Sequence, residues 1–158
     1  MNMKTIQPSL LAFDKNRMEE QIALCAQNGV QIIHYDVMDG IYVPNKAFET
    51  EYLDLLRKYN IKAAIHLMTK NVVERVKVYF AYADVVESIV IHPYADLYIN
   101  VQTALYLVNA NGIKGGIAIE NTVNFDLFLI ELIRHSQLVV MMGVTPGAGG
   151  QAYQKKTT

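Results

Sequence analysis

Two histidines and one aspartate lie where they could bind a metal ion together. His34 and Asp36 are two residues apart in the apolar run Ile32–Met38, so on a β-strand both side chains point to the same side. His66 has a similar place in the apolar run Lys62–Met68. Two imidazoles and one carboxylate suit zinc, iron(II) or manganese, with coordination positions left open for a substrate. The alternative is that these residues only cap strand ends; we favour the metal site because all three share one depth on neighbouring strands.

A glycine-rich segment, Gly143–Gln151, offers a second kind of chemistry. It follows the apolar run Leu138–Met142, which is typical of a strand. Closely spaced glycines allow backbone N–H groups to approach an anion, and phosphate groups bind in loops of this kind at strand ends. The pattern is equally typical of a flexible turn. Its place directly after a strand keeps the phosphate-binding interpretation open.

Other reactive side chains have simpler explanations. His92 ends the apolar run Val85–His92, where it could line the same site or cap its strand. Cys25 falls on one helical face with Met18 and Ile22, which favours a small core residue over a nucleophile. Because it is the single cysteine, an internal disulfide is excluded and a reducing compartment is indicated.

Short apolar runs alternate with longer helix-period segments along the chain, which predicts repeated strand–helix units. The helix signal is clear at Val101, Ala104, Leu105 and Val108, which fall on one helical face. The strand starts recur at the spacing of a βα repeat with a parallel crossover. The predicted strands are Ile6–Leu11, Ile32–Met38, Lys62–Met68, Val85–His92, Lys114–Ile119 and Leu138–Met142.

Helix boundaries are marked by three local signals. Asn28-Gly29 and Asn111-Gly112 are expected to end helices, because glycine readily adopts the left-handed conformation at that position. Asn71 followed by Glu74 predicts a capping box at the start of the third helix.

A repeated βα pattern leaves two architectures, an open doubly wound sheet or a TIM (β/α)8 barrel. A dinucleotide-binding sheet would carry a G-x-G-x-x-G motif after its first strand, whereas this loop reads Ala12-Phe13-Asp14. A closed barrel needs at least about 200 residues, more than the 158 present. We therefore expect an α/β fold of the TIM (β/α)8-barrel type, incomplete, with about six βα units. Residues 1–158 would form a single barrel domain that lacks the last two units.

The composition excludes several classes of protein. The chain is 52% hydrophobic with a formal net charge of −1, so it has no electrostatic footprint for nucleic acid. Its apolar runs fall far short of the roughly 20 residues of a membrane helix. The N-terminus makes a poor signal peptide because Pro8 interrupts its short apolar stretch. We expect a soluble, cytoplasmic protein without a nucleic-acid or membrane partner.

Four motifs, in this order, resemble those of the ribulose-phosphate 3-epimerase family. The family's opening Pro-Ser-Ile/Leu-Leu strand is matched by Pro8–Leu11. Its His-x-Asp-Val-Met-Asp-Gly-x-x-Val-Pro-Asn motif is matched by His34–Asn45 at every fixed position. Its His-Leu-Met is His66–Met68, and its Met-x-Val-x-Pro-Gly-x-x-Gly-Gln is Met142–Gln151. Together they span most of the chain, so the resemblance is far more specific than any one motif.

The resemblance implies an isomerase that converts D-ribulose 5-phosphate to D-xylulose 5-phosphate at C3 through an enediolate. At the matching positions His34, Asp36 and His66 would hold one divalent metal ion, and Asp36 would be one of two acid–base carboxylates. Ser9 and His66 would contact the sugar phosphate. An apolar wall beside the reacting carbons would consist of Met38, Met68 and Met142. The substrate-binding loop would consist of Gly147, Ala148, Gly149 and Gly150.

This sequence departs from the family in several places. The family's second acid–base aspartate, also a metal ligand, lies in a Val-Asp-Gly-Gly strand after the sixth helix, and the 158 residues contain no candidate for it. Ala148 replaces an aromatic residue in the glycine-rich loop, and Thr145 replaces an asparagine. Ile119–Thr122 stands where Leu-Asn-Pro is common.

Two alternatives follow from these departures. The altered loop residues keep open an allulose-6-phosphate 3-epimerase, which acts on a longer sugar. The absent carboxylate keeps open a catalytically incomplete remnant that binds phosphate without turnover. In addition, an open barrel would expose edge strands and apolar core, so we expect association into a homo-oligomer.

Overall fold

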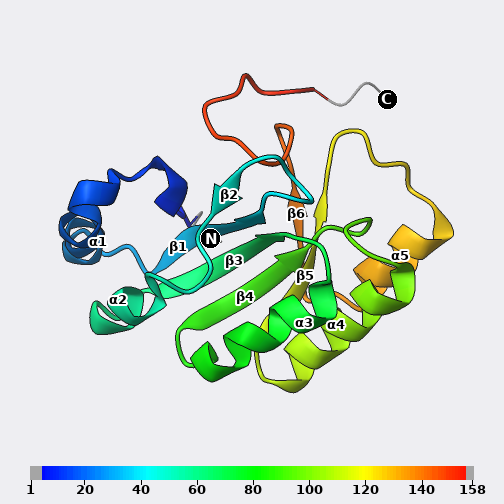
Figure 1. Ribbon diagram of the computed structural model, residues 1–158, viewed down its shortest axis with the longest axis horizontal. Coiled ribbons are helices and arrows are strands. Elements are labelled where there is room, and N and C mark those ends of the chain that lie inside the picture. Colours follow the sequence, from blue (N-terminus) through cyan, green and yellow to red (C-terminus); the bar gives the residue numbers. More distant parts are fainter. Residues whose placement is uncertain (1–4, 156–158) are drawn as a thin grey trace.

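One six-stranded sheet forms the centre of the protein, in a computed structural model that describes residues 5–155 (Figure 1). Its strands lie in the order β2-β1-β3-β4-β5-β6, and neighbours are parallel except for the antiparallel pair β1 and β2. The strands are β1 (Ile32–Asp39), β2 (Lys46–Ala47), β3 (Lys62–Met68), β4 (Val86–Ile91), β5 (Lys114–Ile119) and β6 (Leu138–Met141). The five longer strands confirm the predicted positions to within one residue at either end.

Helical segments connect the strands and lie around the outside of the sheet in Figure 1. The chain passes through α2, α3, α4 and α5 in turn between successive parallel strands, as βα repeats require. The α-helices are α1 (Met18–Gln27), α2 (Leu53–Lys58), α3 (Val72–Lys77), α4 (Tyr98–Ala110) and α5 (Leu127–Arg134). Three short 3-10 helices are η1 (Leu10–Ala12), η2 (Lys15–Arg17) and η3 (Val78–Tyr82). Within residues 5–155, no helix is both long and apolar enough to cross a bilayer.

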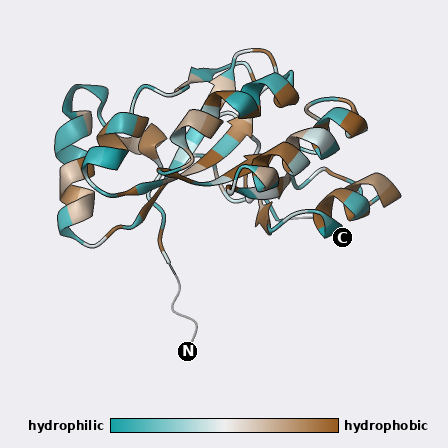
Figure 2. Ribbon diagram, turned by 90° about the horizontal axis from the view of Figure 1, so that it is seen from below, coloured by the Kyte–Doolittle hydropathy of each residue, from teal (hydrophilic) through white to brown (hydrophobic). Residues whose placement is uncertain are grey.

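Alternate side chains of the parallel strands point to opposite faces of the sheet. On β1, Ile33 and Val37 belong to the main apolar core between sheet and helices. His34 and Asp36 point to the other face. β3 is buried at six of its seven positions, which is the pattern of a parallel strand that is covered on both faces. In Figure 2 hydrophobic and hydrophilic stretches alternate along the helices.

The register between β1 and β3 brings two of the three predicted ligands to one level. Asp36 lies directly opposite His66, and two residues later Met38 lies opposite Met68. On the far side of β3, His66 lies opposite Val90 of β4. The expected common depth is therefore confirmed for Asp36 and His66, while His34 lies two residues earlier on β1, opposite Ala64.

The first predicted strand, Ile6–Leu11, is wrong as a strand. Only Ser9 forms a bridge to β1, opposite His34, and the His34 N–H donates to the carbonyl of Pro8 at 2.9 Å. Pro8 has no N–H to extend the ladder, and the Ser9 hydroxyl accepts from the Leu11 N–H to start η1. This segment therefore contacts the sheet at one point and then turns away.

The predicted helix ends are partly correct. Each of α1 and α4 is followed by a glycine with positive φ, Gly29 at 77° and Gly112 at 75°, as predicted. The capping box at Asn71 is wrong. Asn71 is left-handed at φ 54°, its side chain makes no capping bond, and its carbonyl accepts from the Glu74 N–H instead.

The sheet does not close into a barrel within residues 5–155. β6 pairs with β5 only, and β2 pairs with β1 only. The α/β fold with a single, mostly parallel sheet agrees with the predicted incomplete TIM-barrel type. The strand order leaves the carboxyl ends of β1, β3, β4 and β5 side by side, and the functional side chains lie there.

Candidate metal centre

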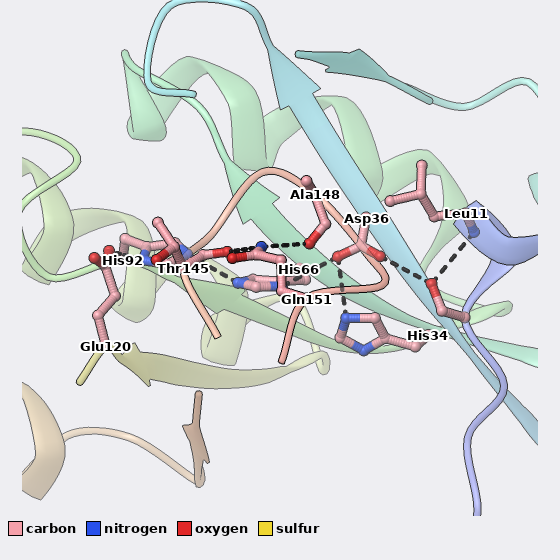
Figure 3. Close-up of polar contacts among 10 residues, drawn as sticks. Leu11, His34, Asp36, His66, His92, Glu120, Thr145, Ala148 and Gln151 are labelled. Carbon is pink, nitrogen blue, oxygen red and sulfur yellow. Dashed lines mark hydrogen bonds and ion pairs between the residues drawn. The ribbon is translucent and has the colours of Figure 1, made fainter. Parts of the chain in front are cut away.

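The three predicted metal ligands lie together on the face of the sheet that points away from the main core (Figure 3). Oδ1 of Asp36 is 3.1 Å from Nε2 of His34 and 3.2 Å from Nδ1 of His66. One ligand atom from each residue lies within 4.8 Å of the other two. The structure therefore brings together the side chains that the sequence singled out, through the register of two adjacent strands.

Burial and charge at this cluster suit a cation. The exposed fractions of Asp36 and His66 are only 8% and 4%. Burial would raise the pKa of Asp36, but the neighbouring imidazoles of His34 and His66 outweigh it and lower this pKa below its ordinary value. Burial lowers the pKa of His66, which favours the neutral imidazole that can offer a lone pair. An ionised carboxylate beside two imidazole nitrogens is a donor set that fits a divalent transition-metal ion.

Ser9 holds the carboxylate from the opposite side. Its hydroxyl donates to Oδ2 of Asp36 at 3.0 Å and accepts from the Leu11 N–H at 3.3 Å. The bridge between Ser9 and His34 fixes this short segment against β1. Oδ1 of Asp36 thus faces the imidazoles while Oδ2 is occupied by the serine.

A cavity of about 650 Å³ lies over the cluster. It brings together all four sequence motifs, although they lie far apart in the chain. The three methionines of the predicted apolar wall, Met38, Met68 and Met142, all line the cavity. The other lining residues are Ser9, Leu11, Ala12, His34, Asp36, His66, Val140, Val144, Thr145, Pro146, Gly147, Ala148, Gly149 and Gly150. The size and the few convergent polar groups are those of a small-molecule site.

The glycine-rich loop after β6 forms the wall opposite the metal cluster. Asn45 Nδ2 donates to the carbonyl of Gly147 at 2.7 Å, which ties the loop to the segment after β1. Gln151 Nε2 donates to the carbonyls of Thr145 and Ala148, at 2.7 Å each (Figure 3). Gly147 has φ 106°, and a Cβ atom there would lie 3.0 Å from the Cβ of Val43. Glycine at this position is required both by the backbone conformation and by the close approach.

Beyond the predicted ligands, three further residues extend the cluster. His92 is fully buried, and its Nε2 lies 2.8 Å from Nε2 of His66. Its Nδ1 lies 2.7 Å from Oε1 of Glu120, which also accepts from the Tyr42 hydroxyl at 2.7 Å. The hydrogen bond from His92 lowers the pKa of Glu120. We call Asp36, His66, His92 and Glu120 the strand-end row.

Sequence reasoning left the role of His92 open and gave Glu120 none. Both residues directly follow a strand, His92 after β4 and Glu120 after β5. That position is the available signal, because the carboxyl ends of neighbouring parallel strands meet at one edge. The pairing itself depends on side-chain directions that spacing in the sequence does not give.

Known proteins of one family match this chain over nearly its whole length. A family model described as the ribulose-phosphate 3 epimerase family matches residues 5–158. The ribulose-phosphate 3-epimerase of Buchnera aphidicola (Acyrthosiphon pisum) is 37% identical over 99% of this chain and 68% of its own length. The enzymes of the same name from Escherichia coli K12 and Mycoplasma genitalium are 34% and 32% identical, over 99% and 94% of this chain and 68% of each relative.

A solved structure supports the fold. The phospho-2-dehydro-3-deoxyheptonate aldolase of Thermotoga maritima superposes with a TM-score of 0.55 over 87% of this chain and 40% of that chain. The sequence identity is 14%, so this likeness concerns the arrangement of strands and helices alone.

Proposed function

The chain belongs to the ribulose-phosphate 3-epimerase family, and we propose that it converts D-ribulose 5-phosphate to D-xylulose 5-phosphate with a divalent metal ion held by His34, Asp36 and His66. The observation that carries this proposal is the convergence of these three donors on one side of a cavity whose other wall is the glycine-rich loop. The cavity thereby offers one end to a sugar's oxygen atoms and the other to its phosphate.

Epimerisation at C3 begins with removal of a proton from a carbon next to a carbonyl group. Asp36 is placed to be the base, because its carboxylate lines the cavity and is ionised at neutral pH. The Ser9 hydroxyl orients the carboxylate through Oδ2. A bound divalent ion would supply Lewis-acid stabilisation of the negative charge that develops on the substrate oxygens.

The remaining walls support the same chemistry. Met38, Met68 and Met142 present thioether side chains to the cavity, and such apolar, polarizable walls keep water from the planar intermediate. In the loop that follows Met142, Gly147 and Gly150 have positive φ, a conformation in which backbone N–H groups can be directed to an anion. We assign the phosphate to Gly147, Ala148, Gly149 and Gly150.

The proposal is tested by incubating the purified chain in deuterium oxide with cobalt(II) or zinc and ribulose 5-phosphate. We expect deuterium at C3, and xylulose 5-phosphate is formed when the proton returns to C3 from the face opposite Asp36. An Asp36→Asn variant should lower the exchange rate about 10²- to 10⁴-fold, the usual contribution of a positioned base. Asp54→Asn is the matched control, because Asp54 lies on α2 with its side chain 75% exposed.

The outcomes separate the candidate functions. If the chain shows no metal binding and no deuterium exchange, the whole assignment is contradicted. Exchange without xylulose 5-phosphate would retain Asp36 as a base and contradict epimerisation. A parallel assay with allulose 6-phosphate tests the longer sugar, which Ala148 at the cavity wall would favour by leaving more room than an aromatic residue.

A further inference from the structure

The strand-end row crosses four neighbouring parallel strands, and three gaps separate its polar atoms. Oδ1 of Asp36 is 3.2 Å from Nδ1 of His66, the two Nε2 atoms of His66 and His92 are 2.8 Å apart, and Nδ1 of His92 is 2.7 Å from Oε1 of Glu120. The rings of His66 and His92 are nearly coplanar, at 19°, with centroids 5.0 Å apart. They therefore meet edge to edge, as a hydrogen bond through in-plane lone pairs requires.

The three gaps can be matched to the available protons. An imidazole in its neutral form carries one N–H, and two protons cannot share one gap, so two neutral rings fill two gaps and leave one without a proton. Lone pairs that face each other repel, and the repulsion is weakest across the longest gap, so we place the protons in the two short gaps. His92 Nδ1–H then donates to Glu120, and His66 Nε2–H donates to His92. Nδ1 of His66 is left without a proton, facing Asp36 across the longest gap.

We propose that Glu120 is a positioning residue that, through His92, fixes His66 in the tautomer whose Nδ1 can bind a metal ion. The inference rests on the proposed metal site and adds the residue that prepares it. An ionised carboxylate is an acceptor only, so it requires a proton on the facing nitrogen of His92 and thereby sets both imidazoles. Metal-binding histidines commonly gain affinity in this way, from a partner on the nitrogen that does not touch the ion.

The surroundings of Glu120 keep its carboxylate directed at His92. The Tyr42 hydroxyl donates to the same oxygen at 2.7 Å, and the Tyr42 ring lies 5.0 Å from the His92 ring, between centroids. His92 itself is fully buried, so the protein supplies its hydrogen-bond partners on both nitrogens. Glu120 is not among the residues that line the main cavity, which separates its role from substrate contact.

The experiment measures the tautomer and the metal affinity separately. Long-range proton–nitrogen NMR spectra of the metal-free chain should show His66 with a protonated Nε2 and an unprotonated Nδ1. In Glu120→Gln the amide can either donate or accept, so we expect averaged nitrogen shifts at His92 and His66. Cobalt(II) affinity should fall about 10- to 100-fold, as for other partners of metal-binding histidines. Glu131→Gln is the control, since it removes the same charge from an exposed pair with Arg134 on α5.

A Glu120→Asp variant withdraws the carboxylate by one methylene without changing the charge, and the same loss of a fixed tautomer is expected. The inference is overturned if both Glu120 variants keep the single tautomer and bind cobalt(II) within about twofold of the parent chain. If the parent chain shows the expected tautomer but binds no cobalt(II), the proposed metal site fails while the action of Glu120 on His66 stands.

Discussion

The two walls of the cavity are built in different ways. The metal wall is carried by β1 and β3, which pair with a neighbouring strand on both edges; five of the eight residues of β1 and six of the seven of β3 are buried. The loop wall follows β6, an edge strand that alternates between half-buried and exposed residues, with Met141 62% exposed. The geometry of the metal wall is fixed by the backbone hydrogen bonds between β1 and β3. The loop wall depends on a few hydrogen bonds, such as those of Asn45 and Gln151.

This difference shows how one site can combine two requirements. A metal centre needs ligand atoms held within narrow limits, and strands that are hydrogen-bonded on both edges provide such positions. A loop on an edge strand has fewer contacts and can adjust to the anion that it surrounds. If the two walls are independent, a change in one of them should leave the properties of the other unaltered.

The largest expected effect is on stability, and it should differ between the two regions. Replacement of the fully buried Ile89 in β4 by alanine leaves a cavity in the main core and should cost about 2–5 kcal/mol of unfolding free energy. Met141→Ala in β6 should cost about 0.5 kcal/mol or less, because the side chain is largely exposed. Urea unfolding monitored by circular dichroism measures both. Equal losses would remove the distinction between a packed sheet and a lightly held edge.

A smaller effect is expected from the loop alone. Gly147→Ala adds a Cβ atom 3.0 Å from the Val43 Cβ at a φ of 106°, so the loop must shift. We expect KM for ribulose 5-phosphate to rise about tenfold, from strain of about 1–3 kcal/mol, with cobalt(II) affinity unchanged. Gly29→Ala is the control, because it imposes a positive φ of 77° on alanine far from the cavity. A parallel loss of cobalt(II) affinity in Gly147→Ala would mean that the walls are coupled.

The smallest effect is a pH dependence that belongs to the metal wall. The pKa of His66 is lowered from its ordinary 6.5, so on acidification the unfolded chain takes up this proton first and the folded state loses stability below about pH 6.5. The slope from one such group is at most about 1.4 kcal/mol per pH unit. Residues 143–151 contain no ionisable side chain, so the loop adds nothing to it. Urea unfolding at pH 7 and pH 5.5 should show the loss, and a His66→Asn variant should show less of it.

The metal wall could be predicted from the sequence because it depends on two regular periods. The two-residue repeat of a strand places His34 and Asp36 on one face, and parallel pairing places His66 at their level. The helix face formed by Val101, Ala104, Leu105 and Val108 is buried for the same reason of periodicity.

The parts that escaped prediction depend on individual side chains or on competing local bonds. Ile6–Leu11 has the composition of a strand, but Pro8 and the capping hydroxyl of Ser9 turn it away from the sheet. The capping box at Asn71 failed because the backbone adopts a left-handed conformation there. The contact of His92 with Glu120 joins residues 28 positions apart. No local sequence pattern predicts the side-chain rotamers that bring these two groups together.

The hydrogen bond from Asn45 to Gly147 joins residues 102 positions apart, and this separation has a consequence during synthesis. A ribosome adds about 5–20 residues per second, so roughly 5–20 seconds pass between the emergence of the two partners. For most of that interval β1 and β3 have both been synthesised, because β3 ends at Met68. The cavity gains its second wall only after the glycine-rich loop has been synthesised and Gly147 has bonded to Asn45, a residue from the first third of the polypeptide.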